Sequence, residues 1–151
     1  MNRHEVLLRQ VEAFREETLH LIEGITEEQA DIVPQGFSNN IRWNLGHLYV
    51  DQYLWIMALT KEPIDFPQGF REWFDYGTSP AGWKGELPSL KELKALLAEQ
   101  PKHIRDVYAD RLDETFPPTE LGMNTIADVL VRTIFHEGLH LAAIQSIRRF
   151  L

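Results

Sequence analysis

The apolar residues of the N-terminal segment recur every three or four positions, which is the spacing of one face of an α-helix. The stripe begins at Leu7 and ends at Ile25, and it predicts a first helix over residues 2–24. One side of this helix is therefore expected to face a hydrophobic core. The intermediate members of the stripe are Val11, Phe14, Thr18 and Leu21.

A second long helix is predicted over residues 40–60, after a short helical turn. Thr26 and Gln29 have the spacing of a capping box, which favours that turn. His47 shares one face of the second helix with residues of core type, so its imidazole is expected to point inward. Its companions on that face are Trp43, Val50, Asp51, Leu54 and Ala58, and the candidate caps are Ser38, Asn39 and Asn40.

A third helix is predicted to begin at a second capping-box pattern, Ser89 followed by Glu92. Its regularly spaced leucines and later apolar positions carry the pattern to Tyr108. Pro101 lies inside this segment and should kink or split the helix, because proline lacks the N–H that would bond to the carbonyl four residues earlier.

The last helix is predicted to begin after a cap at Asn124 or Thr125 and to run almost to Leu151. The sequence therefore contains four long helical patterns and no convincing alternating strand, which predicts an all-α four-helix bundle. A chain of 151 residues has the usual length of one domain, so residues 1–151 are expected to form a single helical-bundle domain.

The segment 61–88, between the second and third helices, contains too many prolines and glycines for a regular helix. It is also aromatic, and a large side chain gains about 1.5–3 kcal/mol when it leaves water. We therefore expect the loop to pack on the bundle, as a flap that completes the core in preference to a lid over a substrate. Its aromatic residues are Phe66, Phe70, Trp73, Phe74, Tyr76 and Trp83.

The charge and the absence of cysteine narrow the range of functions. With 15 Lys+Arg against 23 Asp+Glu, the formal net charge of −8 repels a phosphate backbone and argues against a nucleic-acid partner. Because the chain has no cysteine, a bound metal must use His, Asp or Glu. No signal-peptide run and no stretch of ~20 apolar residues is present, so we expect a cytoplasmic protein without a membrane partner.

Three histidines occupy inward faces of two predicted helices. His136 and His140 are four residues apart, so their Cβ atoms should lie about 5–6 Å apart on the last helix. Both interrupt its apolar stripe, and His47 points inward from the second helix. A buried polar group without a partner costs roughly 1–3 kcal/mol, so one divalent transition metal shared by the three rings explains them better than three separate core imidazoles. The other histidines, expected at the surface or on a helix stripe, are His4, His20 and His103.

Two carboxylates near these histidines are candidate catalytic residues. Residues 136–140 read HEGLH, the zinc-protease pattern in which Glu137 would be the general base. The protease interpretation fails because no His, Asp or Glu follows His140 to supply a third ligand. Glu137 is interpreted as a general base, a support for the ligands or a solvated residue, and Asp51 as a carboxylate that bonds a ligating imidazole or a bound water.

These motifs resemble those of the DinB/YfiT-like family of metalloenzymes. Residues 41–48, IRWNLGHL, are similar to the family's second-helix motif, in which a Trp and a small residue precede the first ligand. Residues 135–140, FHEGLH, are similar to its fourth-helix His-x3-His motif. The resemblance implies an up-up-down-down four-helix bundle, often dimeric, with His47, His136 and His140 as metal ligands.

The resemblance also implies an activity. Some members of the family resemble S-transferases of low-molecular-weight thiols such as bacillithiol, so the implied function is activation of such a thiol by a divalent metal, zinc or nickel. Two alternatives stay open: a hydrolase with metal-bound water as nucleophile, and a metal-binding or ligand-binding bundle without turnover. The implied partners are a small-molecule substrate and a second copy of the chain.

Overall fold

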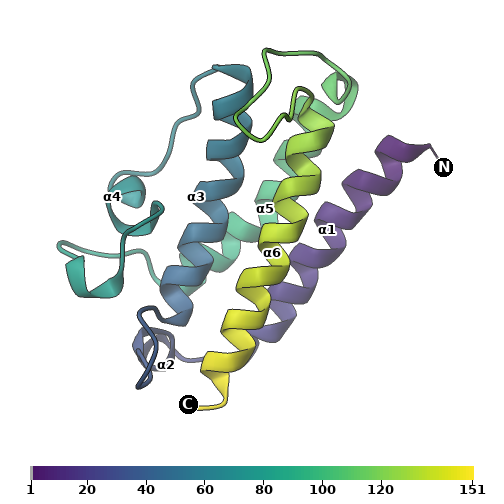
Figure 1. The fold of residues 1–151 in the computed structure, drawn as a ribbon. Helices are drawn as coiled ribbons and strands as arrows, with labels where there is room; N and C mark the ends of the chain where they lie inside the picture. The colour runs from purple at the N-terminus through teal and green to yellow at the C-terminus, as the bar shows by residue number, and fades with distance from the viewer. Residues whose placement is uncertain (1) are drawn as a thin grey trace.

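The computed structural model describes residues 2–151 as a bundle of four long helices (Figure 1). These helices pack around a shared hydrophobic core, which confirms the predicted all-α four-helix bundle. The long helices are α1 (Arg3–Leu21), α3 (Ile41–Thr60), α5 (Leu90–Tyr108) and α6 (Ile126–Arg148). The shorter elements are α2 (Glu27–Asp31), α4 (Phe70–Phe74), and the 3-10 turns η1 (Pro80–Gly82) and η2 (Ala109–Arg111).

The helices begin where the sequence signals an N-cap. The Asn40 side chain caps α3, and the capping boxes at Thr26 and Ser89 are both formed. Of the two candidates for α6, Thr125 is the cap and Asn124 lies outside it. Local side-chain hydrogen bonds to the free N–H groups of the first turn therefore set where each long helix begins, whereas α4 follows Gly69 without a side-chain cap.

The buried face of α1 is rotated relative to the predicted stripe. Phe14 is only partly buried, whereas Arg15 has 2% of its surface exposed. Helix α1 also ends at Leu21 and not at residue 24, and Gly24 follows with a φ of 76°. The rotation places an arginine in the core, which is tolerated only because hydrogen-bonding partners meet it there.

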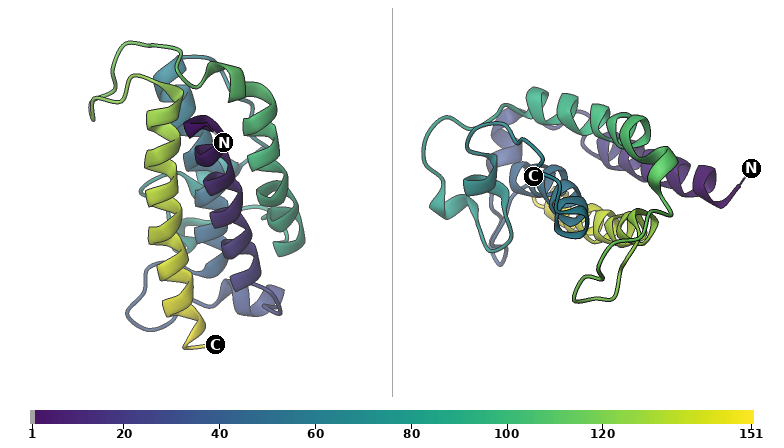
Figure 2. Two further views of the ribbon diagram at one scale, coloured as in Figure 1. Left: turned by 90° about the vertical axis from the view of Figure 1, so that its right-hand side faces the viewer. Right: turned by 90° about the horizontal axis from the view of Figure 1, so that it is seen from above.

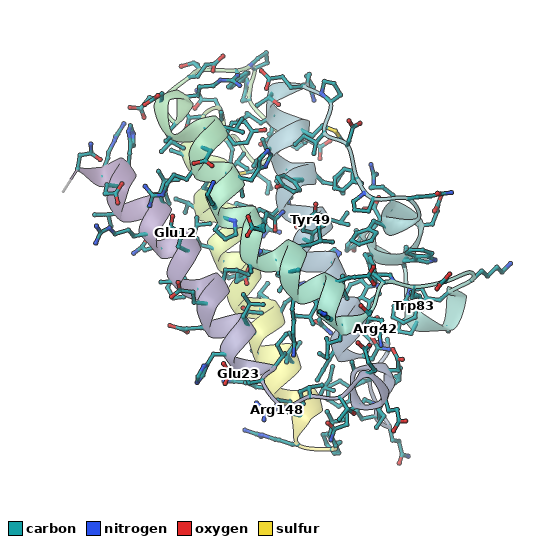
Figure 3. The ribbon with its side chains drawn as sticks, turned by 180° about the vertical axis from the view of Figure 1, so that it is seen from behind. Glu12, Glu23, Arg42, Tyr49, Trp83 and Arg148 are labelled. Carbon is teal, nitrogen blue, oxygen red and sulfur yellow. The ribbon has the colours of Figure 1, made fainter. Side chains whose placement is uncertain are left out.

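In Figure 1 the long helices run down, up, up and down in chain order. The pairs Tyr53 with His103, and Tyr49 with Gln100, show that α3 and α5 are parallel; Tyr49 lies beside α5 in Figure 3. This order differs from the up-up-down-down order that the resemblance implies. That arrangement needs two long crossover connections, whereas only residues 61–89 join two parallel helices here.

The crossover segment, residues 61–89, packs on the outside of α3, as the view from above in Figure 2 (right) shows. Phe70 and Phe74 of α4 are buried, and Trp83 is partly buried, so the prediction that this aromatic loop packs on the bundle is confirmed for them. Tyr76 is 88% exposed, and its expected burial is wrong, because it follows α4 where the chain turns at Gly77.

Arg15 connects all four long helices from the centre of the bundle. Its Nε and Nη2 donate to the two carboxylate oxygens of Glu137 on α6, at 2.9 and 3.0 Å. Its Nη2 also donates to Gln52 on α3 at 3.1 Å, and its Nη1 donates to Gln100 on α5 at 2.9 Å and to the carbonyl of Leu97 at 3.0 Å. Every donor of this buried guanidinium that faces the core is therefore used.

Pro101 lies inside α5 without ending it, so the expected split of that helix is wrong. Proline has no N–H for the carbonyl of Leu97, four residues earlier. That carbonyl accepts the hydrogen bond from Arg15 of α1 instead. The gap in the hydrogen bonding of one helix is thus closed by a side chain from another.

We predict that Arg15→Met lowers the free energy of unfolding by about 3–5 kcal/mol, because Glu137 is left as an unpaired buried charge. Urea denaturation followed by circular dichroism measures the loss. The double variant Arg15→Met/Glu137→Met should recover part of it. Arg9→Met on the exposed side of α1 is the matched control and should cost less than about 1 kcal/mol. Equal losses at the two arginines would contradict the assigned role of the network.

Candidate metal centre

The three histidines singled out in the sequence come together between α3 and α6. Each ring of His47, His136 and His140 offers a nitrogen, and these atoms lie within 4.8 Å of one another. The Nε2 atoms of His136 and His140 are 3.1 Å apart. His47 and His136 are buried and His140 is partly buried, so the group faces inward while keeping one side near the surface.

Protein groups hold the far nitrogens of two of these rings. His47 Nδ1 lies 2.7 Å from the carbonyl oxygen of Phe74, which can only accept, so the proton of His47 is on Nδ1. His140 Nδ1 lies 2.7 Å from Asn44 Oδ1, and Asn44 Nδ2 donates to the carbonyl of Asn40 at 2.7 Å, which fixes the amide orientation. Both rings therefore keep a free lone pair on Nε2.

Asp51 stands beside the third ring. Its Oδ2 lies 3.3 Å from His136 Nδ1 and is otherwise a buried oxygen without a hydrogen-bond partner. Burial raises the pKa of the Asp51 carboxyl, while the neighbouring His47 opposes this rise. A carboxylate in this place favours the tautomer of His136 with its proton on Nδ1, as carboxylates behind metal-ligating histidines commonly do.

The donor set fits a divalent transition metal. With the protons on Nδ1, the Nε2 atoms of His136 and His140 present lone pairs to each other at 3.1 Å and cannot bond to each other. Ligands about 2.0–2.1 Å from a tetrahedral zinc are separated by roughly 3.3 Å, close to this distance. A cation between the rings would replace their repulsion by bonding. Imidazole nitrogens suit zinc and nickel, and also copper and iron.

Burial keeps the ligand rings neutral. The pKa of His136 is lowered to about 3 by burial first and by the neighbouring histidines next. The pKa of His140 is lowered to about 4, again chiefly by burial and then by His47. Both rings are therefore uncharged at neutral pH, which is the state in which imidazole binds a metal.

Trp43 and Gly46, which precede His47, allow the crossover segment to pack closely against the site. The Trp43 ring stacks on the His47 ring, with centroids 4.6 Å apart and planes 10° apart, and its Nε1 donates to Thr78 at 2.9 Å. A Cβ on Gly46 would lie 2.4 Å from the ring of Phe74. Only glycine lets α4 approach closely enough for the Phe74 carbonyl to reach His47. The aromatic loop thus contributes directly to the orientation of a ligand.

Glu137 is directed away from the three histidines. It is 6% exposed, so the solvated interpretation is wrong, and it accepts hydrogen bonds from Arg15 and from Thr18 Oγ1 at 2.7 Å. Burial alone would raise its pKa, but Arg15 and Thr18 outweigh this and hold the pKa below its ordinary value. The carboxylate therefore joins α6 to α1, next in sequence to a ligand.

The remaining histidines lie outside this group. His20 is exposed, and His4 lies 3.1 Å from Asp113 near the start of α1. His103 is bonded to the Tyr53 hydroxyl at 2.8 Å, on the α5 side of α3. Their expected exclusion from the site is confirmed.

Sequence reasoning missed two contributors to the site. Arg15 carries a signal, since it occupies the three-four spacing of the buried residues of α1. The Phe74 carbonyl carries none, because a backbone group has no sequence signature. The buried positions of α1 that show the spacing are Leu8, Val11, Arg15 and Thr18, with Ile22 following the helix.

A helical bundle with a three-histidine group between two helices defines a class of candidate metal-binding proteins. Residues 10–144 match the sequence profile of the DinB superfamily, and the chain therefore belongs to this superfamily. No curated protein matches the chain. Among the helices of residues 2–151, none has the length and apolar character that crossing a bilayer requires.

We predict that Gly46→Ala displaces Phe74, lowering the stability of the metal-free protein by about 1–3 kcal/mol through overpacking. Because the displaced carbonyl no longer orients His47, the affinity for Zn²⁺ should fall roughly 10–100-fold. Urea denaturation and competition with a chromophoric chelator measure the two effects. Gly138→Ala on α6, where a Cβ meets nothing within 4 Å, is the control and should leave the affinity unchanged. Equal affinities of the two variants would contradict the role of Gly46.

Proposed function

We propose that this protein is a metal-dependent thiol S-transferase that uses a low-molecular-weight thiol of the bacillithiol type. The observation that carries the proposal is the convergence of three imidazole Nε2 atoms, two of which have their opposite nitrogens bonded to protein acceptors and the third an adjacent carboxylate. Membership of the DinB superfamily supports it. We propose zinc or nickel as the ion and His47, His136 and His140 as its ligands.

A divalent ion held by three neutral imidazoles carries its full charge and lowers the pKa of a bound thiol toward neutrality. In the transfer, the sulfur attacks an electrophilic carbon of the substrate. The new C–S bond forms as the leaving group departs with the electrons of its own bond, and the thiol proton passes to a base. We propose that Asp51 orients His136 and is the first candidate for that base. Glu137 acts from outside the centre by fixing α6.

Two alternatives make different predictions. In a hydrolase, water replaces the thiol as nucleophile, so turnover proceeds without a thiol. In a bundle without turnover, the metal chiefly ties α3 to α6. Removal of the metal should then lower the melting temperature of the protein strongly.

We predict that the purified protein binds one divalent ion per chain and that His47→Ala loses most of it. Elemental analysis and calorimetric titration measure the binding, and His20→Ala, at an exposed histidine outside the site, should bind normally. With bacillithiol and monobromobimane, the metal-loaded protein should accelerate formation of the conjugate at least about tenfold over chelator-treated protein. Acceleration of ester hydrolysis without thiol conjugation would replace the transferase by the hydrolase. Binding without either reaction would favour the bundle without turnover.

We also propose that two copies of the chain pair through an apolar stripe on α6. Val131, Phe135 and Leu139 are spaced by four residues and are 58%, 62% and 51% exposed, beside the ligand face of the helix. A self-complementary stripe of this kind suits a two-fold interface.

Sedimentation analysis should show a dimer, and Leu139→Glu should convert it to a monomer because a charge would be buried in the interface. Val107→Glu on α5, at another exposed apolar residue, is the control and should remain dimeric. A monomeric wild-type protein at micromolar concentration would exclude this pairing.

A further inference from the structure

Arg132 lies one helical turn before His136 on α6. The four-residue spacing places the two side chains about 40° apart around the helix, so both lie on the side that faces α3. The guanidinium carbon of Arg132 lies 5.1 Å from the centre of the Trp55 ring of α3 and 5.8 Å from the centre of the Phe135 ring. Two aromatic rings therefore hold this cation beside the metal centre.

The half-buried Arg132 lacks the carboxylate partners that the two buried arginines have. Arg15 is paired with Glu137. Arg42, labelled in Figure 3 near the start of α3, is paired with Glu27 at 2.8 Å and with Asp31 at 2.6 Å. No carboxylate forms an ion pair with Arg132 anywhere in residues 2–151, and its Nη1 is shielded from water without a hydrogen-bond acceptor. A shielded charged donor without a partner is costly, so an acceptor from outside the chain would stabilise it.

The charge balance of the centre also calls for an anion. Three neutral imidazoles add no negative charge to balance a bound ion, and Arg132 adds a further positive charge one turn away, so the one carboxylate beside them, Asp51, balances only part of the positive charge. After burial and the neighbouring histidines, the positive charge of Arg132 also contributes to the low pKa of His136. Asp51 is the carboxylate beside His136, and it forms no ion pair with Arg132.

We propose that Arg132 is a specificity residue that binds a carboxylate carried by the thiol substrate a few bonds from its sulfur. This inference rests on the proposed thiol transferase function. The sulfur would occupy the open side of the metal centre, and the carboxylate would pair with the planar fork of the guanidinium, which matches carboxylate geometry.

The experiment compares two thiols that differ only in charge. The full-length protein is loaded with Co²⁺ and titrated with 3-mercaptopropionate and with 3-mercapto-1-propanol, and the sulfur-to-cobalt charge-transfer absorption reports binding without turnover. The wild-type protein should bind the carboxylate-bearing thiol about 10–100-fold more tightly, the value of one charge-assisted interaction. Arg132→Gln should abolish this preference while leaving the affinity for 3-mercapto-1-propanol within about twofold. Arg132→Lys should retain part of it.

Arg149→Gln is the matched control. This substitution removes the same charge at the C-terminal end of α6, 17 residues from Arg132 and therefore about 25 Å away along the helix. The variant should keep the full preference for the carboxylate-bearing thiol. Its normal behaviour would exclude a general effect of net charge.

Each other outcome has a distinct meaning. Cobalt binding with no thiol band for either compound would refute the thiol function and this inference with it. Equal affinities of the wild-type protein for the two thiols would refute the role of Arg132 and leave the thiol function standing. Loss of cobalt binding or of thermal stability in both Arg132→Gln and Arg132→Lys would show that Arg132 is structural, which also refutes the inference.

Discussion

The buried ion pair between Arg15 and Glu137 is the interaction on which the geometry of this bundle depends. One guanidinium meets groups from α3, α5 and α6 while belonging to α1, so the four helices can satisfy it only in one mutual register. Glu137 is next in sequence to His136. The hydrogen bonds that hold the Glu137 carboxylate therefore also fix the backbone that presents His136. A buried ion pair on one face of α6 thus supports the histidines on the adjoining face.

The rings of the candidate metal centre are each positioned by a group that lies behind them. A backbone carbonyl from the crossover segment, an amide from the first turn of α3 and a carboxylate from its middle lie behind the three rings. These are different kinds of group from different parts of the fold. The common result is that each ring turns its Nε2 toward the same point, and each ring owes that orientation to a different neighbour.

The sequence was sufficient to predict the helices and the three-histidine group, and insufficient to predict the groups that support them. Helix periodicity and capping boxes placed the long helices to within a few residues, and His47, His136 and His140 were found because polar rings interrupted apolar stripes. The Phe74 carbonyl has no sequence signature, and the spacing that places Arg15 on the buried face of α1 does not reveal its partners on the other helices. Long-range pairing of this kind is set by tertiary packing, which local patterns do not encode.

Pro101 has a consequence for the order in which the protein assembles. A proline in a helix interior disfavours the isolated helix by about 3 kcal/mol, so the chain around residue 101 has little tendency to stay helical on its own. The compensating donor comes from Arg15, which is more than eighty residues away in sequence. The hydrogen bonding of α5 is thus complete only when α1 packs against it. Because the partners of Arg15 lie on α3, α5 and α6, α1 can pack only when those helices are present. A single proline ring thus makes the stability of α5 depend on the packing of α1.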